Sequence, residues 1–250
     1  MNQQHLALVR NHYPNATTTN RAVVELLALA NQHLNLLPHQ IMLADSICCD
    51  DVNTIEYPQE AYDMLGPFKM GGLNGFPFAG VTGMGAFAGH VPDEGAVLVF
   101  YAPHIGINKT GTLGEISRIG QTKKSGCCGA ARAALNKLLN NQIESGHITE
   151  LDYQMNTIEQ IFLKSERRIK EASNSLFEAT EVMYEAIDER IHLLVEKTQY
   201  PCKYVLLIGS ILINGDHDMG SFCSYKRFDF IDLATKQTTN LLDSFLAKTA

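Results

Sequence analysis

Two long apolar runs dominate the pattern of hydrophobic and polar positions along the chain. Residues 96–102 (AVLVFYA) and 204–213 (YVLLIGSILI) are almost continuously apolar, as are strands buried on both faces of a parallel sheet. Residues 41–48 predict a shorter buried strand, in which Asp45 is the polar exception. Residues 222–232 alternate between apolar and polar positions, which predicts a strand at the edge of a sheet.

Apolar residues recur at helical spacing in four segments that we expect to be helices: 21–36, 128–139, 149–199 and 236–247. Asn20 can cap the first of these helices, and a break near 173–175 divides the third in two. Strands mixed with long helical segments indicate an α/β chain.

Two segments lack this regular pattern. Residues 1–18 are polar, and we expect a loosely held N-terminal segment there. The following residues, 19–250, are enough to bury a full core, and we expect them to form a single domain. Residues 66–95 are rich in glycine and predict a long loop, which inside a compact domain is usually functional.

Charge and composition exclude several classes of protein. The chain has 20 basic and 27 acidic residues, a net charge of −7, which argues against a nucleic-acid-binding surface. No apolar run approaches the ~18 residues of a membrane span. The first residues lack the basic and apolar regions of a signal peptide, so we expect a cytoplasmic protein. In that reducing setting its six cysteines favour metal or redox use over disulfides.

Three potential metal ligands lie where apolar runs end or a helix begins: Cys49, His104 and Cys128. An open α/β sheet builds its site at the carboxyl ends of its strands, so we expect these side chains to meet there. Two thiolates and one imidazole, with a fourth position left for water, are the ligand set of a catalytic zinc site. The adjacent Cys48 and Cys127 are alternatives. Cys48 points to the opposite face from Cys49 if the strand continues.

A series of short motifs in a fixed order resembles the limiting-CO2-inducible protein B/C family, also described as theta-class carbonic anhydrases. The motifs are Cys49-Asp50-Asp51-Val52-Asn53, Gly71-Gly72-Leu73, Gly75-Phe76-Pro77-Phe78, Thr82-Gly83, Ala86-Phe87, His90-Val91-Pro92-Asp93, Pro103-His104-Ile105-Gly106, Gly120-Gln121 and Cys128-Gly129-Ala130-Ala131. The resemblance covers roughly residues 35–235. It implies a fold like that of beta-class carbonic anhydrases, with a mainly parallel central sheet flanked by helices, and a homodimer. It also implies a zinc ion held by Cys, His and Cys, beside an Asp that pairs with an Arg.

Several residues of this chain also match individual motifs of beta-class carbonic anhydrases. Cys49 and Asp51 match the Cys-x-Asp motif of beta-class enzymes, and Cys128 matches their Cys-Gly at a helix start. The beta-class motif continues to an Arg two residues after the Asp, where this chain has Asn53. The Arg must therefore come from elsewhere. Arg118 is our candidate, and Arg132, one turn into the helix after Cys128, is the alternative.

The resemblance implies a zinc-dependent lyase that hydrates CO2 reversibly to bicarbonate. Asp51 is expected to accept a hydrogen bond from the attacking water, and Arg118 to keep Asp51 ionised. His90 lies in the glycine-rich segment, where it is a rival metal ligand or, better placed, a pocket-lining or proton-relay residue. Two alternatives remain on the same fold. One is a scaffold without activity that serves in a complex, and the other is a zinc hydrolase of another small substrate, such as carbonyl sulfide.

Overall fold

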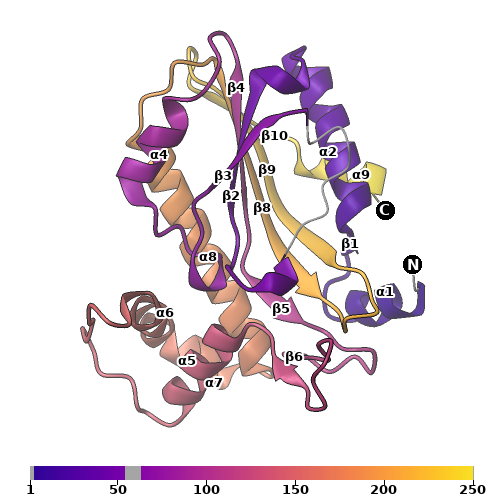
Figure 1. Cartoon of the computed structure of the whole chain (residues 1–250), viewed down its shortest axis with the longest axis vertical. Helices are drawn as coiled ribbons and strands as arrows, with labels where there is room; N and C mark the ends of the chain where they lie inside the picture. Colours follow the sequence, from indigo (N-terminus) through magenta and orange to yellow (C-terminus); the bar gives the residue numbers. More distant parts are fainter. Residues whose placement is uncertain (1–2, 54–62, 250) are drawn as a thin grey trace.

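The computed structural model describes residues 3–53 and 63–249, and its centre is one large mixed sheet (Figure 1). The strands follow the order β1-β9-β8-β4-β2-β3, with β10 beside β9 and β5 beside β8. Their bounds are Thr17–Thr18 (β1), Ile41–Ser46 (β2), Leu65–Lys69 (β3), Ala96–Tyr101 (β4), His104–Gly106 (β5), Tyr204–Asn214 (β8), Phe222–Asp232 (β9) and Gln237–Asn240 (β10). A small separate ribbon pairs Glu115–Ile116 (β6) with Ser125–Gly126 (β7).

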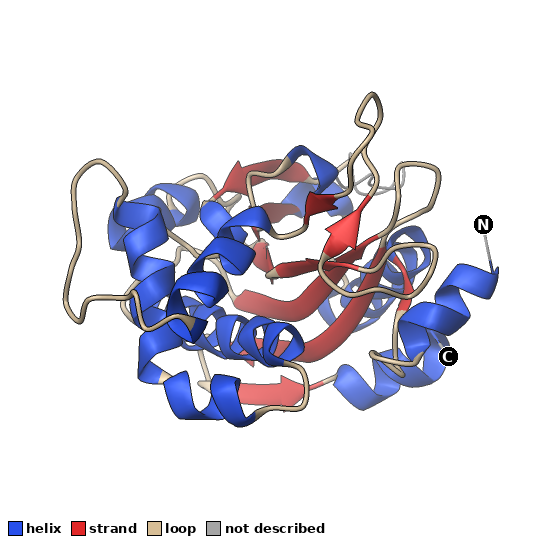
Figure 2. Cartoon of the chain, turned by 90° about the horizontal axis from the view of Figure 1, so that it is seen from below, coloured by secondary structure: helices blue, strands red, loops and turns tan. Residues whose placement is uncertain are grey.

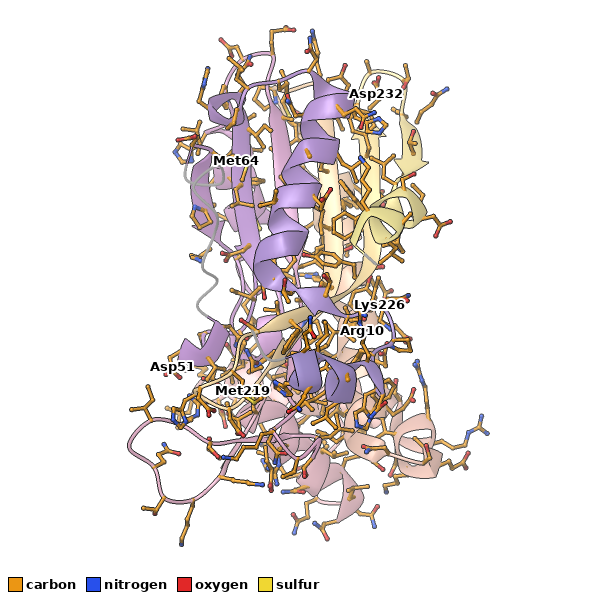
Figure 3. The ribbon with its side chains drawn as sticks, turned by 90° about the vertical axis from the view of Figure 1, so that its right-hand side faces the viewer. Arg10, Asp51, Met64, Met219, Lys226 and Asp232 are labelled. Carbon is orange, nitrogen blue, oxygen red and sulfur yellow. The ribbon has the colours of Figure 1, made fainter. Side chains whose placement is uncertain are left out.

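The centre of the sheet is parallel, as the long apolar runs predict. Strands β3, β2, β4 and β8 run in the same direction, and β5 continues the parallel pairing along β8. Their carboxyl ends therefore meet at one edge of the sheet, the lower end in Figure 1. Figure 3 shows Asp51, after β2, and Met219, after β8, at this end, whereas Asp232, where antiparallel β9 ends, lies at the opposite end.

Helices cover both faces of the sheet, as Figure 2 shows. Their bounds are Gln3–Arg10 (α1), Thr19–Leu34 (α2), Gly80–Ala88 (α4), Gly129–Leu139 (α5), Tyr153–Lys164 (α6), Glu166–Glu171 (α7), Ser175–Glu196 (α8) and Leu242–Thr249 (α9). Helices α2 and α9 cover one face, and α4 and α8 cover the other. Helices α5, α6 and α7 pack on one another and on α8 near the lower end.

Alternation along the buried strands produces two hydrophobic clusters, one on each face. Leu43 and Leu98 join the cluster that contains Phe245 of α9. Val99 and Val205 join the larger cluster with the helices of the opposite face. Because the strands are apolar on both faces, the sheet is anchored firmly from both sides. This anchoring fixes the positions of the residues that follow each strand at the carboxyl edge.

The N-terminal segment is more ordered than its polar composition predicts. Helix α1 buries His5 and Val9, and Thr17 of β1 pairs with Cys223 of β9. The His5 ring lies 2.9 Å from the Ile107 carbonyl oxygen. The prediction of a loosely held segment is wrong because these partners lie more than 90 residues away in sequence, where no local pattern can reveal them. Whether residue 18 marks a domain boundary stays a prediction.

The glycine-rich segment 66–95 is not a continuous loop. It begins within β3, and its middle forms α4, which buries Met84, Phe87 and Ala88. These three residues recur at helical spacing and give the helix one buried face. Glycine lowers helix propensity, so it concealed this pattern in the sequence.

Three other expectations need correction. Strand β9 is not an edge strand, because β1 and β10 pair with its outer side. The predicted closing helix at 236–247 is instead β10 followed by α9. Residues 149–199, which we expected to form two helices, contain three, α6 to α8, and α7 begins directly after Ser165. Within the described parts of the chain, no helix is long and apolar enough to cross a membrane.

Asn174→Ala should lower the free energy of unfolding by about 1 kcal/mol. The Asn174 side chain caps α8 by accepting hydrogen bonds from the backbone N–H groups of Leu176 (3.1 Å) and Phe177 (3.0 Å). Alanine leaves both donors without this acceptor. Urea denaturation of the variant and the wild type measures the difference, and Asn174→Asp, which keeps an acceptor, should retain most of the stability. Equal stability of the alanine variant would contradict the role of this cap.

Candidate metal centre

Three buried side chains meet at the carboxyl edge of the sheet: Cys48, His104 and Cys128. Cys48 follows β2, His104 begins β5, and Cys128 immediately precedes α5. One ligand atom from each residue, the two sulfurs and a ring nitrogen, lies within 4.8 Å of the others. The sequence places these residues far apart, and the parallel strands bring them together because both β2 and β4 end at this edge.

The imidazole of His104 is oriented so that one nitrogen remains available. Its Nδ1 lies 2.8 Å from Oδ1 of Asn214, at the end of β8. Its Nε2 is buried and has no hydrogen-bond partner among the described residues. A buried polar atom without a partner is unfavourable, and coordination of a metal ion by Nε2 removes this cost. Two sulfurs and one imidazole nitrogen also match the ligand preference of zinc, so the residues fit this ion.

A turn from η3 (Leu73–Gly75) supports two of the three side chains. The backbone N–H of Asn74 donates to Sγ of Cys48 (3.2 Å), and Oδ1 of Asn74 accepts from the backbone N–H of His104 (3.3 Å). Asn74 adopts a left-handed backbone conformation (φ 51°), which Asn tolerates better than most residues. The neighbouring Gly75 has no room for a side chain, because a Cβ would lie 2.2 Å from the Ala102 carbonyl oxygen. Sequence reasoning missed the role of Asn74.

The three ligand side chains shift one another's protonation. The thiol of Cys128 donates a hydrogen bond to Cys48, which is the main cause of a lowered pKa for Cys48 and a raised pKa for Cys128. Burial by itself lowers the pKa of His104, but its interactions with the surrounding cysteine sulfurs, chiefly that of Cys128, outweigh burial and raise it. Without metal, Cys48 is therefore the thiolate of the group.

Cys48, rather than the predicted Cys49, belongs to this group. Cys49 is exposed, and its backbone N–H lies 3.4 Å from the Gly72 carbonyl oxygen. The expectation assumed that β2 continues through position 48, but β2 ends at Ser46, and the chain then turns the Cys48 side chain inward. Cys128 joins the group as expected. Its neighbour Cys127 lies beside the ring, with Sγ 3.5 Å from Nδ1 of His104.

Arg118 pairs with both neighbouring aspartates. Its guanidinium forms an ion pair with Asp51, as predicted, and Nη2 donates to both carboxylate oxygens of Asp50 at 2.8 Å. The Asp50 side chain is 18% exposed, whereas that of Asp51 is 86% exposed. Burial by itself raises the pKa of Asp50, but the hydrogen bonds from Arg118 and the charge of His104 outweigh burial and lower it. The Cys-x-Asp spacing therefore also fits Cys48 and Asp50.

The comparisons with known proteins agree with this geometry. A family model described as limiting CO2-inducible proteins B/C beta carbonic anhydrases matches residues 17–232. The chain belongs to this family. No curated protein matches the chain significantly.

Solved structures of limiting CO2-inducible proteins share the fold. PtLCIB4, described as a homolog of the limiting CO2-inducible protein LCIB, superimposes with a TM-score of 0.78 at 27% sequence identity, covering 94% of this chain and 98% of that chain. LCIB itself superimposes with a TM-score of 0.73 at 20% identity, covering 96% of this chain and 98% of that chain. At this identity, the likeness to LCIB concerns the fold alone.

Two further residues that the sequence suggested for the site, Arg132 and His90, lie outside the metal-ligand group. Arg132 donates to the Gly114 carbonyl oxygen (3.0 Å) and pairs with Glu115, so it does not replace Arg118. His90 is exposed after α4, with its ring centre 6.4 Å from that of Phe68. It precedes β4 and therefore lies towards the amino end of that strand, away from the carboxyl edge. The structure does not bring His90 into the metal-ligand group.

Proposed function

We propose that this protein is a zinc-dependent carbonic anhydrase that converts CO2 and water to bicarbonate and a proton, reversibly. The observation that carries the proposal is the buried, unpartnered Nε2 of His104 within 4.8 Å of two cysteine sulfurs. Cys48, His104 and Cys128 would hold the ion. A zinc ion held by these two thiolates and one imidazole would act as a Lewis acid and would lower the pKa of water.

Asp50 and Arg118 give this site its second component. The two hydrogen bonds from Arg118 hold both oxygens of the Asp50 carboxylate and keep it ionised. An ionised carboxylate close to the ligand group can accept a hydrogen bond from the water that attacks CO2 and thereby orient it. Asp50 takes this role because it is half-buried beside the ligands, whereas Asp51 faces solvent.

The family supports two of the remaining expectations, the substrates and the homodimer, and the sequence alone supports the compartment. We propose CO2 and bicarbonate as the substrates, a homodimer as the assembly and the cytoplasm as the compartment. Light scattering of the purified protein tests the homodimer by its mass. The proton-relay role of His90 stays a prediction, and His90→Ala tests it by the dependence of the hydration rate on buffer concentration.

Zinc analysis combined with stopped-flow CO2 hydration tests the proposed function. The purified chain should contain about one zinc ion, and removal of zinc by a chelator should abolish hydration, which added zinc restores. Zinc without CO2 hydration would contradict the carbonic anhydrase assignment and favour a scaffold or another small substrate. Absence of zinc binding would contradict the metal centre itself.

Asp50→Asn should lower the rate of CO2 hydration by about 100-fold, with zinc content unchanged. The amide cannot remain ionised, and it loses one of the two oxygens that Arg118 holds. Asp51→Asn is the matched control, because it changes the adjacent carboxylate in the same way on an exposed side chain. It should retain most of the rate. Loss of activity in Asp51→Asn alone would return the catalytic role to the residue that the sequence favoured.

A further inference from the structure

Asn214, at the end of β8, contacts all three chain segments that carry the candidate metal ligands. Its Oδ1 lies 2.8 Å from Nδ1 of His104 and 3.4 Å from Sγ of Cys127, which precedes Cys128. Its Nδ2 donates to the Val52 carbonyl oxygen (3.0 Å) and to Oδ1 of Asn53 (3.3 Å), in the turn that follows Cys48. The Asn214 side chain is buried, and both its oxygen and its nitrogen are used.

These hydrogen bonds fix the direction of the Asn214 amide. The Val52 carbonyl oxygen can only accept, so the group facing it must be the NH2 of Asn214. Oδ1 then necessarily faces His104 and accepts the proton of Nδ1. With its proton on Nδ1 held by Asn214, the ring can offer only Nε2 to a metal ion, and Nε2 presents its lone pair once zinc binding displaces the second proton of His104. The tautomer required for metal binding is thus set by a hydrogen bond from β8 to β5.

We propose that Asn214 is a positioning residue for the metal centre, which holds His104 in its Nδ1–H form and fixes the ring relative to the turn after Cys48. The inference rests on the proposed zinc site and deepens it. Asn214 itself does not touch the metal. Its effect is on metal affinity, because a ligand that is already oriented loses less conformational freedom when the metal binds.

Asp216 provides a matched control within the same turn. It is also buried and lies two residues further along the chain. Its carboxylate accepts hydrogen bonds from the backbone N–H groups of Lys109 (3.0 Å) and Ser117 (2.6 Å) instead of a metal ligand. Asp216→Asn therefore disturbs the support of a neighbouring loop while leaving the contact between Asn214 and His104 in place.

The experiment measures zinc affinity of the full chain by competition with a chromogenic chelator. Asn214→Ala should weaken zinc binding by about 10- to 100-fold, the usual effect of removing a residue that orients a metal-bound histidine. Asn214→Asp should restore much of the affinity, because a carboxylate also accepts the Nδ1 proton. Asp216→Asn should bind zinc as the wild type does. With cobalt in place of zinc, the visible spectrum should change in Asn214→Ala and remain unchanged in Asp216→Asn.

Wild-type affinity and an unchanged cobalt spectrum in Asn214→Ala would overturn the inference. An equal loss of affinity in Asp216→Asn would also overturn it, because general weakening of the turn would then explain the effect. If Asn214→Ala does not fold, Asn214→Ser replaces it. The zinc affinity of Asn214→Ser is then compared with that of Asn214→Asp in the same way. A wild type that binds zinc without hydrating CO2 would contradict the proposed function and leave this inference testable.

Discussion

Cys48→Ser should remove most of the zinc from the protein, whereas Cys49→Ser should leave the zinc content near that of the wild type. Serine is nearly the same size as cysteine, but its hydroxyl is a poor zinc ligand beside a thiolate and an imidazole. Cys48 is buried with its sulfur near His104 and Cys128, and Cys49 is exposed. Metal analysis after gel filtration measures the result, and CO2 hydration should be lost together with the metal.

The second cysteine pair gives an independent control for this expectation. Cys128→Ser should lose zinc as Cys48→Ser does, and Cys127→Ser should retain it, although both positions are buried. Comparable thermal unfolding of the metal-free variants would show that the difference arises from the ligands. Zinc loss in Cys49→Ser with retention in Cys48→Ser would reverse the assignment and restore the sequence-based choice.

Zinc affinity should rise by about 100-fold for each pH unit around neutrality. The pKa of His104 and the pKa of Cys128 are both raised, so at neutral pH each side chain carries a proton in the metal-free protein. The pKa of Cys48 is lowered, so Cys48 is already a thiolate. Zinc binding must therefore displace two protons, and each proton displaced contributes a factor of about ten per pH unit. Binding is favoured as the pH rises and weakened as it falls.

Chelator competition across about pH 6.5 to 8 measures this slope, and calorimetry in two buffers of different ionisation enthalpy counts the protons directly. A slope of about tenfold per pH unit would mean that His104 or Cys128 has already lost its proton. A slope of about 1,000-fold would mean that Cys48 is a thiol before zinc arrives. Either result would contradict the protonation state inferred from the hydrogen bonds of the site.

The sequence determined the central sheet and the edge where the site lies. Strands β4 and β8 each coincide with a continuous apolar run. A strand that is apolar on both faces must be covered on both faces, which places it in the centre of the sheet. His104 and Cys128 could be chosen because one follows a buried strand and the other begins a helix. These are local signals, carried within a few neighbouring residues, and the order of the motifs was enough to indicate the family.

The tertiary structure decided the choices between neighbouring residues after β2. Whether Cys48 or Cys49 faces the site depends on where β2 stops, and a change of one residue reverses the direction of the side chain. For the same reason, the carboxylate that faces the site is that of Asp50, whereas the sequence favoured Asp51. Arg118 reaches both carboxylates from the loop between β6 and β7, and no spacing in the sequence specifies this placement.

Long-range contacts account for what the sequence could not indicate at all. The Asn214-Gly215 pair looks like an ordinary turn, and its position directly after the strongest buried strand was the one available sign of a role at the carboxyl edge. Its contact with His104 joins residues 110 positions apart, and its contact with Val52 joins residues 162 apart. Hydrogen bonds of this kind depend on the packed sheet, because only the packed sheet brings the ends of β8, β5 and the turn after β2 to the same place.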